Sequence, residues 1–198
     1  MQAHGEAAIR RTAALACVLV VLGLSGCSVE WLEQAEAVPA VPVEPAAWVA
    51  EPCELFSASD LETIFGTVVS FGRNGISRID DPAIEADSRH CRWSADALDA
   101  SLQIASAPDF DSGELACVAP ADPRALEVDL GTRAWWSELT VAESTLGRLR
   151  VCTDGSLIDI TVVGNADAAS AGSPTELAST LRAQAEMMAG ATLLRIDP

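Results

Sequence analysis

The 198-residue sequence contains no lysine and no tyrosine, so arginine supplies all twelve of its Lys and Arg side chains. Asp and Glu together number 29, which gives a formal net charge of −17 at pH 7. Nucleic-acid binders need a basic surface to neutralise phosphates, and this charge argues against that class. It also argues against electrostatic docking on anionic lipid, so any attachment to a membrane must come from acyl chains.

No apolar stretch near the N-terminus is long enough to span a membrane comfortably. The uncharged stretch 12–26 has 15 residues, whereas a spanning helix needs about 20. It follows two arginines and ends in small residues, which is typical of a secretory signal. Leu24-Ser25-Gly26-Cys27 resembles the bacterial lipobox, in which the peptidase cuts before a cysteine that carries diacylglycerol. The resemblance implies that residues 1–26 are removed and that Cys27 becomes a lipidated N-terminus on the outer face of the cell membrane.

Two alternatives stay open for the export step. The first is an ordinary signal peptide with an incidental cysteine. The second is the twin-arginine route, suggested by Arg10 and Arg11, although their neighbours lack the rest of that motif. Behind the signal, residues 27–52 form a proline-rich tether that could reach roughly 75 Å at about 3.1 Å per residue. Residues 53–198 number 146, a common size for one folded domain.

The sequence lacks a CxxC pair, and no two cysteines stand close together as a zinc site requires. Of the six cysteines, one leaves with the signal and Cys27 takes the lipid. An even number remains in an exported chain, which predicts two disulfides with three possible pairings. We favour Cys53–Cys91 and Cys117–Cys152, because both bridges then close loops of similar size.

Residue patterns predict helices at both ends of the domain. Residues 57–66 have a serine cap and a terminating glycine, which indicates a short helix, followed by a strand over 67–71. The C-terminal helix is expected to begin after Ser173 and to end at Gly190. Its buried stripe is expected to contain Leu177, Leu181, Ala185 and Met188.

Hairpins are predicted between these helices. The Gly- and Asp-rich stretch 72–88 is expected to be a loop, 89–106 a hairpin and 133–139 a strand. Residues 148–163 form a second hairpin, in which Asp154-Gly155 suits a type I′ turn. Together these elements predict an α+β fold, with an antiparallel sheet of about five to six strands, helices on one face of the sheet, and disulfides that stabilise it.

Several short motifs resemble those of a family of uncharacterised actinobacterial lipoproteins. They are Pro52-Cys53-Glu54-Leu55 before a helix ending in Phe65-Gly66, then Cys91-Arg92-Trp93, Gly131 to Ala134-Trp135, and a long Ala-rich C-terminal helix. The resemblance implies an envelope-anchored domain of unknown function. It also implies a distant similarity to the extracellular sensor domains of some actinobacterial receptor kinases, and it supplies no catalytic residues.

Patterns of catalytic residues are sparse. His90 is the only histidine left after processing, and its place on a predicted strand beside Cys91 favours a structural role over that of a catalytic base. No serine stands in a GxSxG elbow, and no pair of carboxylates is singled out by its spacing. We therefore expect no enzyme.

Two acidic loops provide oxygen ligands of the kind that calcium prefers. The first holds Asp80, Asp81, Glu85 and Asp87, and the second holds Asp109, Asp111 and Glu114 around Gly113. The EF-hand spacing is broken in both, so solvated loops are the main expectation and calcium is the alternative. No other cofactor is expected.

The pair Trp135-Trp136 is the most suggestive feature for binding. Neighbouring side chains of a strand face opposite ways, so one indole should enter the core. The other is either exposed beside Arg133 and Glu138, where it would hold a sugar, an apolar ligand or a protein, or covered by a loop or the C-terminal helix.

Three function classes follow. We favour a non-catalytic envelope lipoprotein that is anchored through Cys27 and binds a small ligand or an envelope protein. A carrier of lipid or other apolar molecules and a cell-wall hydrolase are the alternatives.

Overall fold

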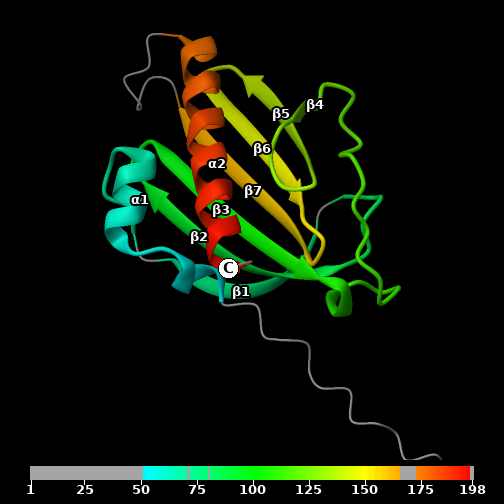
Figure 1. Ribbon diagram of the computed structural model, residues 1–198. Coiled ribbons are helices and arrows are strands. Elements are labelled where there is room, and N and C mark those ends of the chain that lie inside the picture. Colours follow the sequence, from blue (N-terminus) through cyan, green and yellow to red (C-terminus); the bar gives the residue numbers. More distant parts are fainter. Residues whose placement is uncertain (1–50, 71, 80, 166–172, 197–198) are drawn as a thin grey trace, which may run out of the picture. The chain divides into compact units, whose positions relative to one another are not determined.

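The computed structural model describes residues 51–70, 72–79, 81–165 and 173–196 (Figure 1). These residues all belong to one compact unit, Val43–Pro198. The predicted signal, the lipidation site Cys27 and most of the tether lie outside the described residues. Among the helices that are described, none is both long enough and apolar enough to cross a bilayer.

Seven strands form an antiparallel sheet in the order β1-β2-β3-β7-β6-β5-β4. Their bounds are β1 Arg73–Arg78, β2 Asp87–Ala95, β3 Leu98–Ser106, β4 Leu126–Val128, β5 Arg133–Val141, β6 Ser144–Cys152 and β7 Ser156–Asn165. The helices are α1 Ala58–Phe65 and α2 Pro174–Ile196, with short 3-10 turns at Pro52–Leu55 and Ala107–Asp109. The predicted α+β class is confirmed, with one or two strands more than expected.

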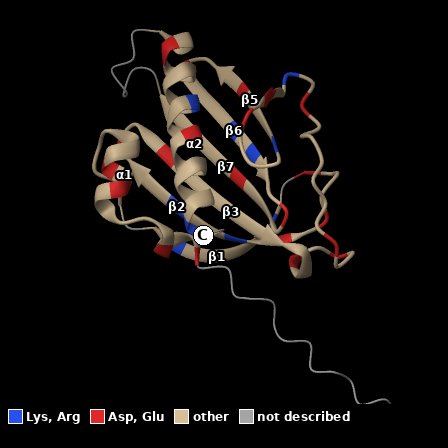
Figure 2. Ribbon diagram, in the orientation of Figure 1, with Lys and Arg blue, Asp and Glu red and all other residues tan. Residues whose placement is uncertain are grey.

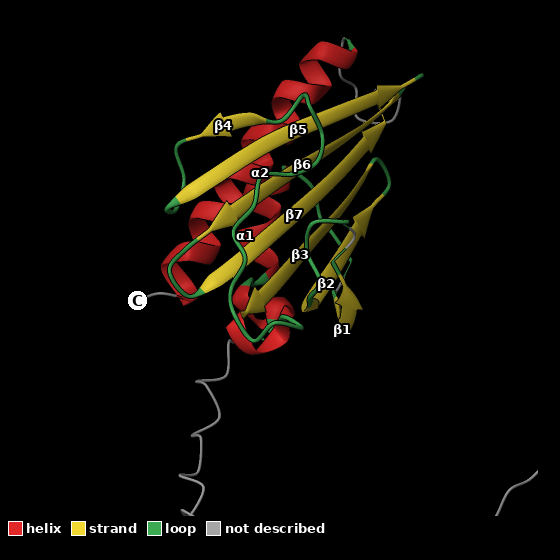
Figure 3. Ribbon diagram, turned by 90° about the vertical axis from the view of Figure 1, so that its right-hand side faces the viewer, coloured by secondary structure: helices red, strands yellow, loops and turns green. Residues whose placement is uncertain are grey.

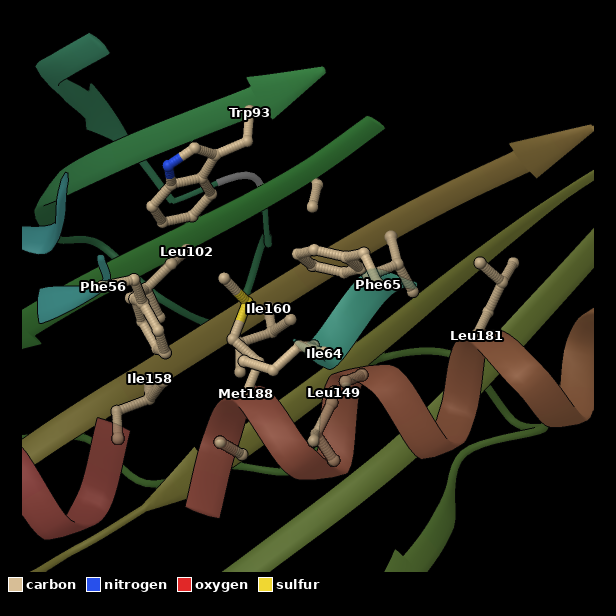
Figure 4. Packing of buried hydrophobic residues seen from close by; sticks show 14 of the residues in the cluster. Phe56, Ile64, Phe65, Trp93, Leu102, Leu149, Ile158, Ile160, Leu181 and Met188 are labelled. Carbon is tan, nitrogen blue, oxygen red and sulfur yellow. The ribbon is translucent and has the colours of Figure 1, made fainter. Parts of the chain in front are cut away.

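Both α-helices lie on one face of the sheet, and the main core fills the space between them and the strands (Figures 1 and 4). The stripe predicted for α2 is confirmed, because all four of its residues are buried. Ser173 caps this helix, since its Oγ accepts a hydrogen bond from the Glu176 backbone N–H at 3.2 Å. The core between helices and sheet includes Phe56, Ile64, Phe65, Trp93, Leu102, Trp136, Leu149, Ile158, Ile160, Leu181 and Met188.

The opposite face of the sheet is covered by chain from the loops rather than by a helix. The segment between β3 and β4 crosses in front of the strands in Figure 3, with the helices behind them. Phe110 and the loop around Cys117 pack there with Trp135, Leu157 and Ile84 in a second buried cluster. This layer buries side chains whose burial the sequence pattern does not predict.

The two disulfides join the predicted cysteines and support the layers. Cys53 is bonded to Cys91 on β2, and Cys117 is bonded to Cys152 at the end of β6. The first bridge fixes the start of the domain on the helix side of the sheet. The second fixes the covering loop on the other side. The favoured pairing is confirmed.

Three local predictions are wrong. Residues 67–70 form no strand, and within the stretch predicted as a loop, 73–78 form the edge strand β1. This strand is polar and largely exposed, so it carries no alternating apolar pattern to reveal it. The helix α2 continues through Gly190 to Ile196, because tertiary packing outweighs the weak helix propensity of a single glycine.

The turn between β6 and β7 also differs from the prediction. Neither Asp154 nor Gly155 has the positive φ that a type I′ turn requires. The Thr153 hydroxyl instead accepts hydrogen bonds from the backbone N–H groups of Gly155 and Ser156. A side-chain turn of this kind needs no left-handed residue.

Candidate functional site

Strand β5 divides the four predicted binding residues between the two faces of the sheet. Trp136 and Glu138 point toward α2, whereas Arg133 and Trp135 point toward the covering loop. Both indoles are buried, at 2% and 5% exposure. Of the two alternatives for the second tryptophan, the structure has the covered one, because the loop before β4 packs over Trp135.

Each tryptophan already has its own partner. The Trp136 Nε1–H donates to Glu138 Oε2 at 3.0 Å, and its ring lies where a Cβ on Gly147 would stand. The Arg133 guanidinium lies 4.7 Å from the centre of the Trp135 ring, within the range of a cation–π contact. The four residues therefore form two pairs on opposite faces of the sheet, and one pair, Trp136 and Glu138, lines a second pocket beside α2.

The first acidic loop contributes to a buried ion cluster. Arg150 is fully buried, and it donates from Nε and Nη2 to the two oxygens of Asp159 at 2.9 and 3.0 Å. Its Nη1 donates to Asp81 Oδ2 at 2.9 Å, and Arg148 donates to Asp159 Oδ2 at 2.7 Å. In Figure 2, basic residues on β6 lie beside an acidic residue on β7.

The arginines and aspartates of this cluster are paired with one another, as in a cluster that stabilises the fold. Burial lowers the pKa of Arg150, but the hydrogen bonds and charges of Asp159 and Asp81 outweigh burial and raise that pKa above its ordinary value. The guanidinium therefore stays charged. Within these four residues, two arginines balance two aspartates.

The remaining acidic residues are spread over the surface. Asp87 lies 3.7 Å from Arg78, and Arg78 also holds Asp111 through two hydrogen bonds. Glu85 and Glu114 are not in the buried clusters, Asp109 caps a 3-10 turn, and Asp80 lies outside the described residues. Across the described part of the chain, no three His, Cys, Asp or Glu side chains converge as metal ligands.

His90 lies on β2, on the face away from the helices. Its ring covers Gly75 of the neighbouring strand, since a Cβ on that glycine would come within 2.5 Å of the ring. Its Nδ1 is buried and has no hydrogen-bond partner within the described residues. This placement fits the structural role predicted for it.

A pocket of about 400 Å³ lies between α1, α2 and the turn that joins β2 to β3. Leu98, Leu177 and Leu181 form its apolar wall together with Phe65. The polar groups around it are Gln184 and Thr180 of α2, Thr67 after α1, and Asp96 in the turn. Its volume lies within the range of about 300–1,000 Å³ that is usual for small-molecule sites.

The local sequence explains why the space is open. Gly66 ends α1 in the left-handed conformation, with φ of 68°, and lines the pocket beside α2. Gly164 on β7 forms part of the pocket wall, and a Cβ there would stand 3.0 Å from Leu177 Cδ1. A side chain at position 164 would therefore take up part of this space.

Gln184 is the unusual residue of this pocket. It is 9% exposed, and its Nε2 donates at 3.3 Å to the backbone carbonyl of Phe65, the last residue of α1. Its Oε1 is buried and has no hydrogen-bond partner within the described residues. An unpaired buried acceptor of this kind costs about 1–3 kcal/mol unless something donates to it.

The sequence contains a sign of this residue that the helix prediction did not use. Gln184 follows Leu181 by three positions and precedes Met188 by four, so it stands within the apolar stripe. A lone amide among buried residues needs partners.

No protein-family model and no curated protein matches the sequence.

Proposed function

We propose that the chain is an exported lipoprotein whose domain binds a small ligand, without catalysis, in the pocket between α1 and α2. The pocket containing Gln184 is the observation that carries this proposal. The lipobox at Cys27 and the resemblance to envelope lipoproteins support the anchored location. The two disulfides favour an oxidising compartment.

The pocket lining supports binding rather than catalysis. Among its described residues, Asp96 is the sole titratable side chain, and it is exposed in a hairpin turn. A nucleophile needs a base within hydrogen-bond reach, and a glycosidase needs two carboxyl groups. A concave wall that combines apolar side chains with several polar groups is a common form of ligand site.

Filling the pocket with a larger side chain tests the proposed binding function. The soluble chain that follows the lipidated cysteine, residues 28–198, is exported so that its disulfides form, and a fragment library is screened by ligand-observed NMR. Thr180 lines the pocket but is exposed on α2, so Thr180→Trp should fill the pocket while preserving the fold. We expect this variant to lose the fragments that the unmodified chain binds.

Ala183→Trp is the matched control, because Ala183 is exposed on the same helix and does not line the pocket. It should bind as the unmodified chain does. Binding that survives in Thr180→Trp, or a library with no binder for the unmodified chain, would overturn the proposed function.

The anchor is tested separately in cells with an alkyne analogue of palmitate. The label should attach to the full chain and disappear in Cys27→Ala, whereas Cys17→Ala should keep it. A label that persists in Cys27→Ala, or is absent from the unmodified chain, would exclude lipidation at this cysteine. The pocket would be unaffected by that result.

A further inference from the structure

We propose an oxyanion site on the face of the sheet away from the helices, which takes the phosphate group of a small ester with an uncharged body. The site belongs to a line of five side chains across the sheet, here named the arginine row: Arg73, Arg92, Ser101, Thr161 and Arg148. This inference goes beyond the proposed function, because the pocket between α1 and α2 lies on the opposite face.

Strand pairing brings the arginine row together. Arg73 on β1 is the register partner of Arg92 on β2, and Arg92 is in turn the partner of Ser101 on β3. Ser101 pairs with Thr161 on β7, and Thr161 pairs with Arg148 on β6. Register partners of antiparallel strands carry their side chains on the same face, with Cβ atoms about 4.5–5.5 Å apart. The five side chains therefore stand next to one another although they are far apart in sequence.

The row is open to solvent near Arg92. Cys91 and Trp93, its neighbours on β2, are buried in the core beneath the helices. Arg92 therefore points to the other side of the sheet, which faces the viewer in Figure 3. Arg92, Ser101 and Thr161 line a groove of about 330 Å³ there, and all of its described lining residues belong to β2, β3 and β7. The covering loop contributes none of them, so a ligand can reach the row.

Arg73 and Arg92 form a pair of like charges on neighbouring strands, an arrangement that destabilises a sheet. Both are exposed, and neither has an ion pair or a ring contact in the part of the chain that the structure describes. The other described arginines are all engaged: Arg78, Arg124, Arg148, Arg150, Arg182 and Arg195 with carboxylates, Arg133 with the Trp135 ring, and Arg89 with a neighbour. An anion between the two guanidinium groups would relieve their repulsion.

Two guanidinium groups side by side match a phosphate better than a carboxylate. Each presents a planar fork of N–H donors that fits two oxygens of an oxyanion. A phosphate ester has a charge of about −1.5 to −2 at pH 7 and three acceptor oxygens, whereas a carboxylate has one charge and two oxygens. Ser101 beside Arg92 adds a hydroxyl that can donate to the third oxygen. Arg148 is already held by Asp159 at 2.7 Å, so the site lies at the Arg73 end of the row.

The surrounding charge limits the ligand to a small ester. Asp99 lines the same groove and accepts a hydrogen bond from the Ser94 hydroxyl, so a second negative charge on the ligand would be repelled there. The chain as a whole has a net charge of −17, which opposes the approach of a polyanion or an anionic membrane. A single phosphate on an uncharged body meets the two guanidinium groups at short range and the least of this repulsion.

The probes are inorganic phosphate and glycerol 3-phosphate, with acetate as the carboxylate. Dissociation constants are measured at pH 7 by ¹H–¹⁵N chemical-shift titration of the exported chain 28–198, at a constant ionic strength set with sodium chloride. We expect both phosphates to shift amide signals of β1 and β2, and glycerol 3-phosphate to bind at least as tightly as inorganic phosphate. Acetate should bind about fivefold more weakly or worse, because it leaves one guanidinium without a partner.

Arg73→Gln and Arg92→Gln should each raise the dissociation constant of inorganic phosphate about three- to tenfold, as expected for one charge-assisted contact at an exposed site. Arg182→Gln is the matched control. It removes the same charge, but Arg182 lies on α2 and is paired with Glu186 at 2.8 Å, so the constant should change less than about twofold. Asp99→Asn should tighten phosphate binding severalfold. Substitution of these exposed row and groove residues leaves the core intact.

Vesicles that contain phosphatidylglycerol present the same chemistry from a lipid headgroup, and the chain 28–198 should not sediment with them. The proposal is overturned if inorganic phosphate causes no saturable shift, or if Arg182→Gln weakens binding as much as Arg73→Gln and Arg92→Gln do. Equal affinities for acetate and phosphate would refute the phosphate class, and vesicle binding that Arg92→Gln abolishes would refute the small ester. None of these results changes the proposed function, which Thr180→Trp tests on the other face.

Discussion

Replacing Arg150 with methionine tests how the second face of the sheet is held together. The side chain is fully buried and joins Asp159 on β7 to Asp81 in the loop before β2. It also donates to the Val118 carbonyl of the covering loop at 3.3 Å. One guanidinium therefore connects two strands and two loops.

Arg150→Met would leave two buried carboxylates with Arg148 as the remaining cation. Removing one partner of a buried ion pair costs about 3–5 kcal/mol, because the other charge stays buried without compensation. That is a large part of the roughly 5–15 kcal/mol that stabilises a typical domain. We expect the free energy of unfolding, measured by urea denaturation at pH 7 with the disulfides intact, to fall by this amount.

Two further variants separate charge from packing. Arg150→Met combined with Asp159→Leu removes one charge of each sign, so it should recover part of the loss. Arg182→Met removes an exposed pair with Glu186 at 2.8 Å and should cost about 0–1 kcal/mol. If Arg150→Met cost no more than Arg182→Met, the buried cluster would not stabilise this face and the reasoning would be refuted.

Three further changes have defined outcomes. Gly147→Ala should cost about 1–3 kcal/mol and alter the near-ultraviolet circular dichroism, because the new Cβ would collide with the Trp136 ring. Ala142→Gly should raise the free energy of unfolding by about 0.5–1 kcal/mol, since Ala142 has φ of 54°. Asp111→Asn should weaken the acid sensitivity of the urea midpoint. The Arg78 hydrogen bond holds the pKa of Asp111 below its ordinary value of 3.8, so its contribution is present above about pH 4 and is lost as the pH falls.

Each change has a control or a contrary result. Gly155→Ala meets no atom within 4 Å and has no positive φ, so it should leave stability nearly unchanged. A similar loss in both glycine variants would contradict the collision argument. A destabilising Ala142→Gly would show that the turn tolerates its φ without strain. If the urea midpoint of Asp111→Asn fell with pH as steeply as that of the unmodified chain, the ion pair between Arg78 and Asp111 would not contribute to stability.

The parts of the fold that could be predicted from sequence are those whose pattern is local. The capped helices and the two hairpins have apolar side chains at the right spacing and turn residues between them. The disulfide pairing followed from loop size. β1 and the short β4 could not be found in this way, because edge strands need no apolar face and take their order from pairing with a neighbour.

The candidate site was less accessible to prediction. Strand alternation separated Trp135 from Trp136, but no local pattern says that the loop with Cys117 folds back over the first of them. The pocket depends on how α1, α2 and a hairpin turn meet, which is set by tertiary packing. Gln184 was visible as a polar residue in an apolar stripe. Its unpaired oxygen emerged only once the end of α1 was in place.

The bridge between Cys53 and Cys91 has a mechanical consequence. A covalent bond joins the point where the domain begins to β2, within the sheet. Tension that arrives along the chain from a membrane anchor would pass through the sulfur atoms into that strand. The enclosed chain, which contains α1 and one side of the pocket, would be bypassed by the load and could not be pulled out. The pocket wall that α1 supplies would thus carry none of that load.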